Sequence, residues 1–435
     1  MPRRSRRSFA TTIIDGSSGK MPTVLKRRSI YANTDDVYLL LTSAVFVVSL
    51  GYGSLLPVTV PFIEHLADGG RRYDTSWHAG MLTGVYTLAL FAFAPICGRF
   101  ADHVGLRPVL LTGLAGYVAT VSLFGLSPTL FQAYAMRVAS GVFAAAVLPV
   151  AMAFAGASHP AEQRARRFAG LSAAAGLGLL AGPALSGFTT RAGATSSSAG
   201  LWHWALASPF AVAAALGALA WVALFFRLPS GVMHTITITQ DGARVRPTLF
   251  LLLMLLMFGI GSFEVAIALR AQRFLGMPAT AISLIFMECS VVMIAAQLAV
   301  FRSSPAWLHS GLVTTSAFVA LAGGMALLPY SDSDPGVVGL VGLIAAAAGI
   351  LVPVVNYRIS VDAGDHQGAA LGKSIAAGNL GQAAGSFAAG VLFNVRPEAP
   401  FWLSAGLLAG AALVSTRVAA TARNVACPST EEERG

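Results

Sequence analysis

The sequence contains few charged residues. Asp, Glu, Lys and Arg make up 11% of its 435 residues, whereas 55% are hydrophobic. An ordinary soluble domain has about a quarter of its residues charged. A soluble chain this apolar would have to bury nearly all of its surface, whereas a bilayer accepts apolar side chains around the whole circumference of a helix. The composition therefore predicts a polytopic membrane protein in contact with lipid.

The sequence also has few groups of the kind that carry out chemistry. Its three cysteines, Cys97, Cys289 and Cys427, have neither paired spacing nor metal-ligand spacing, so we expect no disulfide and no metal site. It has no phosphate-binding G-x-x-x-x-G-K-[ST] loop, which disfavours an ATP-driven pump. It has no catalytic Ser/His/Asp or Cys/His arrangement either. We expect neither an enzyme nor a bound cofactor.

The 29 Lys and Arg outnumber the 19 Asp and Glu, which gives a net charge of +10. An excess of this size could indicate a nucleic-acid partner, but eight Lys and Arg lie within the first 28 residues, in RRSRR and KRR clusters. Such clusters beside membrane spans are typical of a cytoplasmic tail. We therefore expect the lipid bilayer, and no nucleic acid, as the partner of this charge.

Apolar runs of about twenty residues, each long enough to cross a bilayer, predict twelve helices. Breaks at charged residues and at Pro, Gly and Ser clusters give the spans 38–63, 78–97, 109–126, 130–156, 168–188, 204–226, 249–275, 280–300, 310–328, 337–355, 370–393 and 400–422. An even number of spans puts both termini on one side of the membrane. In this threading, 22 of the 29 Lys and Arg fall on that side. The positive-inside rule makes it the cytoplasm and predicts a multi-pass inner (plasma) membrane protein.

The chain is predicted to divide into two six-helix halves. The longest cytoplasmic link, 227–248, separates residues 38–226 from residues 249–422, and the tails cover residues 1–37 and 423–435. Ser158–Gly176 and Ser360–Gly378 are identical at seven of nineteen positions. These stretches precede the fifth and eleventh helices, and a match there is typical of an internal parallel repeat.

The link between the second and third predicted helices, GRFADHVGLRP, carries a recognisable pattern. Gly98, Asp102, Gly105 and Arg107 resemble the loop between helices two and three of the major facilitator superfamily, G-x-L-a-D-r-x-G-r-k/r, although Phe100, His103 and Pro108 depart from it. The resemblance implies a fold of twelve helices in two halves related by a pseudo-two-fold axis. It also implies that Asp102 faces the start of the eleventh helix and acts as a conformational latch, where a helix N-terminus would favour its charge. The alternative is that these are solvated loop charges.

Arg137 is a cation well inside the fourth predicted helix, in AMRVASGVFAAAV. Burying it would cost at least about 2.5 kcal/mol on insertion scales, so it should face a wet cavity. The segment resembles the R-x-x-q-G-x-g motif of the proton antiporters of this superfamily, with Gly141 in register and Ser140 where Gln is usual. The resemblance implies a part in proton coupling, and the alternative is a structural ion pair.

The fifth predicted helix contains GLGLLAGPALSG. It resembles the antiporter signature G-(x8)-G-P-x-x-G-G through Gly178, Gly182, Pro183 and Gly187, with Ser186 replacing one glycine. Gly-Pro in mid-helix removes a backbone hydrogen bond, and the glycines let a partner helix approach. The alternative is glycine-mediated packing with no antiporter role.

Glu264 and Glu288 are the acids placed well inside the predicted apolar spans. Their depths could put both carboxyl groups in one layer of the bundle, if each helix has a favourable rotation, and such groups could carry a coupling proton. Asn379 and Gln382 are three residues apart and share a helix face. With Tyr52, Tyr86 and Tyr134 they could line a substrate cavity. The alternatives are polar groups that hold helices together, and aromatic residues in lipid contact or helix packing.

Together, these features predict a proton-coupled antiporter that exports a small amphipathic or cationic compound, such as a drug or metabolite, and works as a monomer. One alternative is a specific exporter of a siderophore, sugar or amino acid. Another is a receptor or assembly factor on the same fold that transports nothing.

Overall fold

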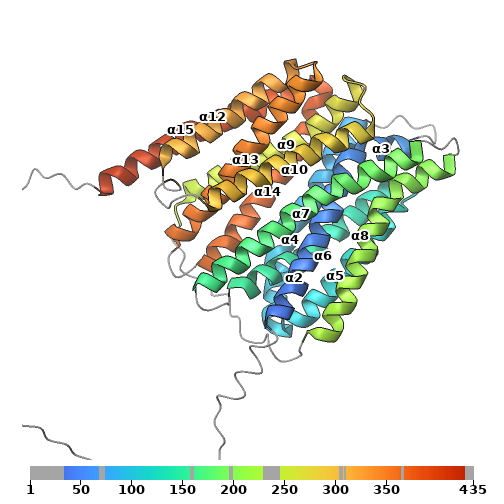
Figure 1. Ribbon diagram of the computed structural model, residues 1–435, viewed down its shortest axis with the longest axis horizontal. Helices are drawn as coiled ribbons and strands as arrows, with labels where there is room; N and C mark the ends of the chain where they lie inside the picture. The colour runs from blue at the N-terminus through green and yellow to red at the C-terminus, as the bar shows by residue number, and fades with distance from the viewer. Residues whose placement is uncertain are drawn as a thin grey trace, which may run out of the picture.

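The computed structural model describes residues 34–67, 74–156, 161–194, 199–228, 245–302, 307, 310–363 and 367–426. Its elements are helices that run side by side in one bundle (Figure 1). They are α2 (Thr34–Leu55), η1 (Leu56–Val58), α3 (Thr59–Ala67), α4 (Thr75–Val104), α5 (Leu106–Gly125), α6 (Leu130–Gly156), α7 (Ala161–Ala194), α8 (Ala199–Arg227), α9 (Pro247–Arg273), α10 (Ala279–Phe301), α12 (Gly311–Leu327), η2 (Leu328–Tyr330), α13 (Asp334–Asp362), α14 (Gln367–Val395) and α15 (Ala399–Ala426). Most of the two predicted tails and of the predicted linker lies outside the described residues.

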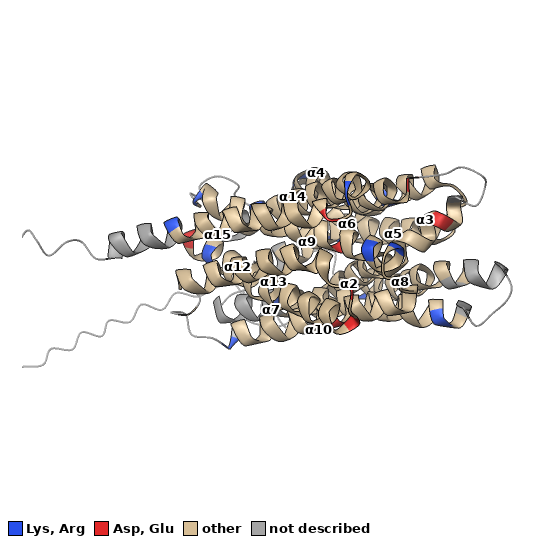
Figure 2. Ribbon diagram, turned by 90° about the horizontal axis from the view of Figure 1, so that it is seen from above, with Lys and Arg blue, Asp and Glu red and all other residues tan. Residues whose placement is uncertain are grey.

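The prediction of an all-α membrane protein is confirmed. Within the described residues, eleven helices are long and apolar enough to cross a membrane. The glycine- and amide-rich α14 is long enough to cross a membrane but is not among these eleven apolar helices. Figure 2 shows long stretches of helix without a charged residue. The bundle has two ends, which we name the tail end, where α2 begins and α15 finishes, and the α3 end opposite to it (Figure 1).

The link between the second and third helices is much shorter than predicted. We expected a loop from Gly98 to Pro108, but α4 continues to Val104 and α5 begins at Leu106. Gly105 alone interrupts the helix, with φ 94° and ψ 154°, a conformation that glycine adopts at little cost. Ala101 and Leu106 are buried on either side of the break, and packing of this kind sustains the helix beyond the apolar run.

The first predicted helix is interrupted. The span 38–63 is observed as α2, the short 3-10 helix η1 and α3. Pro57 lies in η1 and supplies no backbone N–H to the preceding turn, so a regular α-helix cannot continue through it. The sixth element, α6, has the predicted bounds, and α7 extends several residues beyond its predicted span at both ends.

Helices α9 and α14 contact α3 and α4 at the α3 end. The Gln272 side chain donates a 2.9 Å hydrogen bond to Glu64, and Arg273 donates one of 2.7 Å to Ser76. The Asn394 amide donates to the Asp74 carboxylate. These contacts join α9 and α14 to α3 and to the start of α4.

Two pairs of glycines show how α4 and α14 diverge. At the α3 end, a Cβ atom added to Gly80 would lie 2.7 Å from the Cα of Gly390, so the two backbones are in contact there. Gly98 and Gly372 are each 18 residues from these positions, about five turns, and therefore lie on the same helix faces. A Cβ atom on either would meet nothing within 4 Å. Within the described residues, the two helices are therefore in backbone contact at Gly80 and Gly390 but not at Gly98 and Gly372.

Candidate functional site

Three polar side chains from distant parts of the chain meet inside the bundle. The hydroxyl of Tyr52, on α2, donates a 2.6 Å hydrogen bond to Oε2 of Glu264, on α9. Nε2 of Gln382, on α14, lies 3.1 Å from the same carboxylate oxygen and 2.9 Å from the Tyr52 hydroxyl oxygen. We call these residues the Glu264 cluster. A carboxylate with two donors on one oxygen is well held, because charge-assisted hydrogen bonds are the stronger kind.

Glycines on α9 and α14 bring Gln382 to Glu264. The backbone of Gln382 packs directly on Gly261, which is three residues before Glu264, and any side chain there would collide with it. Gly381 and Gly385 pack in the same way on the backbones of Met254 and Phe258. Small residues that allow such close backbone contact are typical of helix pairs in membranes.

The predicted antiporter motif on α7 packs on the helix that carries Tyr52. A Cβ atom on Gly182 would lie 2.6 Å from the carbonyl carbon of Gly53, and one on Gly178 would lie 2.8 Å from the Cβ of Ser49. Ser186, which replaces a motif glycine, donates a 2.7 Å hydrogen bond to the carbonyl oxygen of Ser54. These contacts hold α2 immediately beside Tyr52.

The other motif residues of α7 pack on two neighbouring helices, α2 and α10. Pro183 packs on α2, because its Cδ would lie 3.2 Å from a Cβ placed on Gly53. Gly187 faces α10, where a Cβ would meet the Cβ of Ser283 at 2.7 Å. The α7 motif thus lies between α2 and α10.

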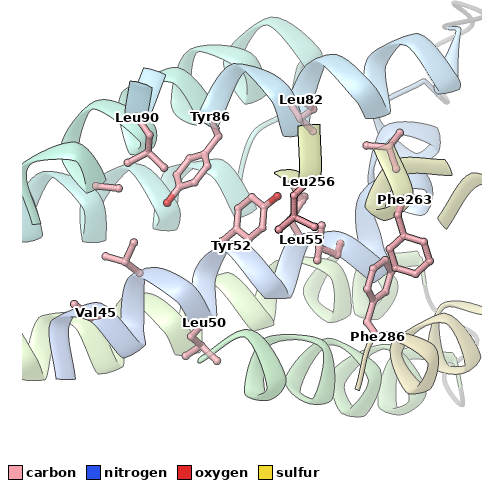
Figure 3. Packing of buried hydrophobic residues seen from close by; sticks show 14 of the residues in the cluster. Val45, Leu50, Tyr52, Leu55, Leu82, Tyr86, Leu90, Leu256, Phe263 and Phe286 are labelled. Atoms are coloured by element: carbon pink, nitrogen blue, oxygen red, sulfur yellow. The ribbon is translucent and has the colours of Figure 1, made fainter. Parts of the chain in front are cut away.

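Aromatic rings continue the site from Tyr52 towards α4 and α6. The rings of Tyr52 and Tyr86 are stacked, with centroids 5.4 Å apart and planes inclined by 28°. Figure 3 shows the two side chains in the space between α2 and α4. The guanidinium carbon of Arg137 lies 4.8 Å from the centroid of Tyr86 and 5.2 Å from that of Phe124. Arg137 is therefore linked to Glu264 through the two stacked tyrosines.

Arg137 is a buried cation without an ion pair among the described residues. It is 2% exposed, and its Nε and Nη2 atoms have no hydrogen-bond partner in the described part of the chain. Two aromatic faces partly offset the loss of water through cation–π attraction. The alternative prediction, a structural ion pair for Arg137, has no partner residue within these ranges.

Other predicted residues lie apart from the Glu264 cluster. Tyr134 is hydrogen-bonded to Nδ1 of His78 at 2.8 Å, near the start of α4. Asn379 is half-buried on α14, about one turn before Gln382. Glu288 is half-buried on α10, and Oε1 would lie 3.2 Å from a Cβ placed on Gly342 of α13. The structure therefore brings Glu264 into a shared cluster and leaves Glu288 at a different helix contact.

Three of the four predicted latch residues can be placed in the described part of the chain. Gly98 faces open space, and Arg107 donates a 3.0 Å hydrogen bond to the carbonyl oxygen of Phe225 on α8. Gly105 forms the break between α4 and α5. Asp102 belongs to α4, and its side chain lies outside the described residues.

Sequence reasoning missed several residues of the site. Phe124 and Tyr117 lay in the span 109–126 and His78 in the span 78–97, both of which we interpreted only as helix. The Tyr117 hydroxyl donates a 2.9 Å hydrogen bond to the carbonyl oxygen of Val48. The glycines that press α9 against α14 were also missed. The G-x-x-x-G spacing of Gly381 and Gly385 was the available signal.

Comparisons with known proteins agree with this architecture. The family model of the Major Facilitator Superfamily matches residues 41–373. Multidrug resistance protein 1 of Bacillus subtilis is 24% identical over 378 residues, 85% of this chain and 93% of the relative. Quinolone resistance protein NorA of Staphylococcus aureus is 23% identical over 85% of this chain and 93% of its own length. The class D tetracycline resistance protein of Salmonella ordonez is 35% identical over 41% of each chain.

Solved structures share the fold. The human organic anion transporter MFSD10 (TETRAN) superposes with a TM-score of 0.67 at 18% identity, over 88% of this chain and 99% of its own. A bacterial homologue of the human lysosomal transporter Spinster, in an inward-facing and occupied conformation, superposes with a TM-score of 0.63 at 15% identity, over 89% and 96%.

Proposed function

This chain belongs to the major facilitator superfamily, and we propose that it exports a small amphipathic or cationic compound, a drug or metabolite, in exchange for protons. Relatives that cover most of its length are multidrug and quinolone resistance proteins, which supports an efflux role. The observation that carries the proposal is the Glu264 cluster, in which one carboxylate joins helices from both parts of the chain.

Glu264 is proposed to carry the coupling proton. Tyr52 and Gln382 both donate to Oε2, so Oε1 is the oxygen on which a proton can reside. A cationic group placed beside Glu264 stabilises the carboxylate and displaces that proton. Return of a proton neutralises the carboxyl group and releases the cation. Substrate and proton then exchange by competing for one acid.

The aromatic side of the site suits an amphipathic cation. The stacked rings of Tyr52 and Tyr86 offer apolar faces and π-electron density next to the carboxylate. Arg137 lies behind Tyr86 as a fixed positive charge. Its field disfavours two added positive charges at once, so a proton and a cationic substrate are not held together. In this proposal, Arg137 enforces the one-for-one competition.

We also propose the orientation and the movement. The tail end is cytoplasmic, as the distribution of Lys and Arg predicts, so the structure is open to the cytoplasm and closed at the α3 end. Residues 38–226 and 249–422 move as two halves of a monomer. The Glu264 cluster lies where these halves meet. A change in the charge of Glu264 therefore alters the hydrogen bonds that hold the halves together at this point.

The test is transport by purified protein in proteoliposomes with an imposed proton gradient, wild type against Glu264→Gln. The amide keeps the shape of the side chain and cannot cycle a proton. We expect the variant to lose uphill accumulation of a fluorescent cationic drug. It should exchange labelled for unlabelled drug only at higher drug concentrations, because its neutral side chain binds the cation less tightly. Uphill accumulation at the wild-type level in Glu264→Gln would contradict the proposal. Loss of both activities in a well-folded variant would show a binding role without proton coupling.

A further inference from the structure

Glu288 is half-buried at the edge of an exposed face of α10, beside α13. Leu284, four residues earlier, is 64% exposed and Val291, three residues later, is 52% exposed, and these spacings place all three side chains on one face. α10 packs on α7 elsewhere, through Ser283 and Ser290. This face is therefore directed towards lipid.

The carboxyl group of Glu288 lies beside a stretch of α13 that contains two glycines. Its Oε1 atom is next to Gly342 of α13. On the same side of α13, Gly339 is exposed and a Cβ atom there would meet nothing within 4 Å, and Leu343 is 42% exposed. The α10 and α13 backbones meet one to two turns further along, where a Cβ on Gly349 would lie 2.7 Å from the carbonyl oxygen of Met293. Absent side chains at Gly339 and Gly342 thus open a lipid-side groove beside the acid.

The groove lies deep in the membrane. Glu288 is nine residues past the start of α10 at Ala279, about 14 Å along the helix, and Gly342 is eight residues past Asp334, about 12 Å along α13. In a hydrocarbon core about 30 Å thick, both positions are near the middle. A carboxylate at this depth is costly and marks functional positions in membrane proteins. Among the described residues, no side chain donates a hydrogen bond to it or pairs with its charge.

We propose that Glu288 and the groove beside Gly342 form a second binding site, open to the bilayer, for lipophilic cations. The proposal rests on the proposed export function, because it gives the exported cation an entrance from the membrane. The apolar part of such a cation fits the surface of Leu284, Val291 and Leu343, and its positive charge pairs with the carboxylate. Few solutes other than amphipathic cations bring positive charge to this depth of a bilayer.

The site is distinct from the Glu264 cluster. Glu264 is enclosed by α2, α9 and α14, whereas Glu288 is at the lipid side of α10 and α13. Cargo is therefore captured at one acid and exchanged for a proton at the other. Loss of Glu288 should weaken capture from the membrane without uncoupling transport.

The experiment uses the full chain in lipid nanodiscs with a photoreactive tetraphenylphosphonium derivative as the probe. After irradiation, labelled peptides from α10 and α13 are quantified by mass spectrometry for wild type, Glu288→Gln and Gly342→Leu. Leu298→Ala is the matched control, because Leu298 is an exposed apolar residue of the same helix that lies ten residues from Glu288. We expect Glu288→Gln to reduce labelling of these two helices by about tenfold, the effect of losing roughly 1.4 kcal/mol of binding. Gly342→Leu should reduce it by filling the groove.

A second measurement separates this proposal from the proposed function. In proteoliposomes, Glu288→Gln should raise the KM for tetraphenylphosphonium, leave kcat close to wild type, and preserve uphill transport. Equal labelling in Glu288→Gln and wild type would overturn the site, as would labelling confined to other helices. Loss of uphill transport with labelling retained would make Glu288 a proton carrier, and a change in oligomeric state would make this face a contact between copies. Either result would also overturn the site. The Glu264→Gln transport test examines only the proposed function, so its result does not depend on any of these outcomes.

Discussion

Tyr52 and Glu264 are 212 residues apart in the sequence, and a 2.6 Å hydrogen bond joins them inside the bundle. The bond connects α2 to α9, so it crosses between the two predicted halves of the chain. Tyr52 also stacks on Tyr86, and the Arg137 guanidinium group lies over the Tyr86 ring. Tyr52 therefore connects the carboxyl group proposed to carry the proton, through Tyr86, with the buried cation Arg137. This arrangement makes Tyr52 the most informative residue to alter.

Tyr52→Phe removes the hydroxyl and keeps the ring. A hydrogen bond to a charged group contributes about 1.5–3 kcal/mol, so the contact between α2 and α9 should weaken by that order. We expect affinity for an aromatic cation to stay within about threefold, because stacking remains, and uphill transport to fall strongly. Binding and transport assays on one preparation check this. A Tyr52→Leu variant, which also loses the ring, should lose affinity as well. If the Phe and Leu variants bind equally poorly, the ring has no separate role.

Gly80→Ala and Gly390→Ala test the closure at the α3 end. A methyl group on Gly80 would lie 2.7 Å from the Cα of Gly390, and one on Gly390 would lie 2.9 Å from the Cα of Gly80. Backbone atoms cannot move aside as a flexible side chain can, so each variant should force α4 and α14 apart there. We expect a longer distance between spin labels placed on α3 and at the end of α9. Gly406→Ala and Gly410→Ala on α15, where a methyl group meets nothing within 4 Å, are the controls.

Gly372→Ala should have the opposite effect. The added methyl group meets nothing in this structure, so it costs little here. When the tail end closes, Gly98 and Gly372 lie on the faces that approach each other, and the methyl group should hinder that step. We expect the population open at the tail end to increase, as measured by labels on α5 and α13 near that end. Unchanged distance distributions would mean that α4 and α14 do not meet at these glycines.

Arg137→Ala should abolish uphill transport, and Arg137→Lys should restore it in part. Lysine keeps the charge but lacks the planar guanidinium that lies on two aromatic rings. Thermal unfolding in detergent is the accompanying control, because truncation of this buried side chain also leaves a cavity beside two aromatic rings. An Arg137→Ala variant that still accumulates drug against a gradient would leave Arg137 without a role in coupling.

The helices could be predicted from the sequence because length and apolar composition identify a membrane span. The spans followed from this property, and α6 was found at its predicted bounds. The link from α4 to α5 was predicted wrongly, because its charged residues resemble a loop while Ala101 and Leu106 are buried by neighbouring helices. Composition does not show that tertiary contact.

The site could be predicted only in part. Glu264 and Gln382 stood out as polar residues in apolar spans, but the sequence could not show that they touch or that Tyr52 joins them. Glu264 and Glu288 have similar depths, and only the rotation of each helix about its axis separates them. That rotation depends on close contacts such as Gly261 on Gln382 and Gly187 on Ser283. These contacts arise from the packed structure and have no local sequence signal strong enough to fix the angle.

The central claim is that binding of a cation at Glu264 releases one proton from that carboxyl group. The most direct measurement is proton release from the purified, weakly buffered protein on addition of a cationic drug, with a pH-sensitive dye. We predict release by the wild type, by Leu298→Ala and by Glu288→Gln at saturating drug. We predict none by Glu264→Gln, even at the higher drug concentrations that saturate its weaker binding. Undiminished release by a drug-binding Glu264→Gln variant would contradict the account.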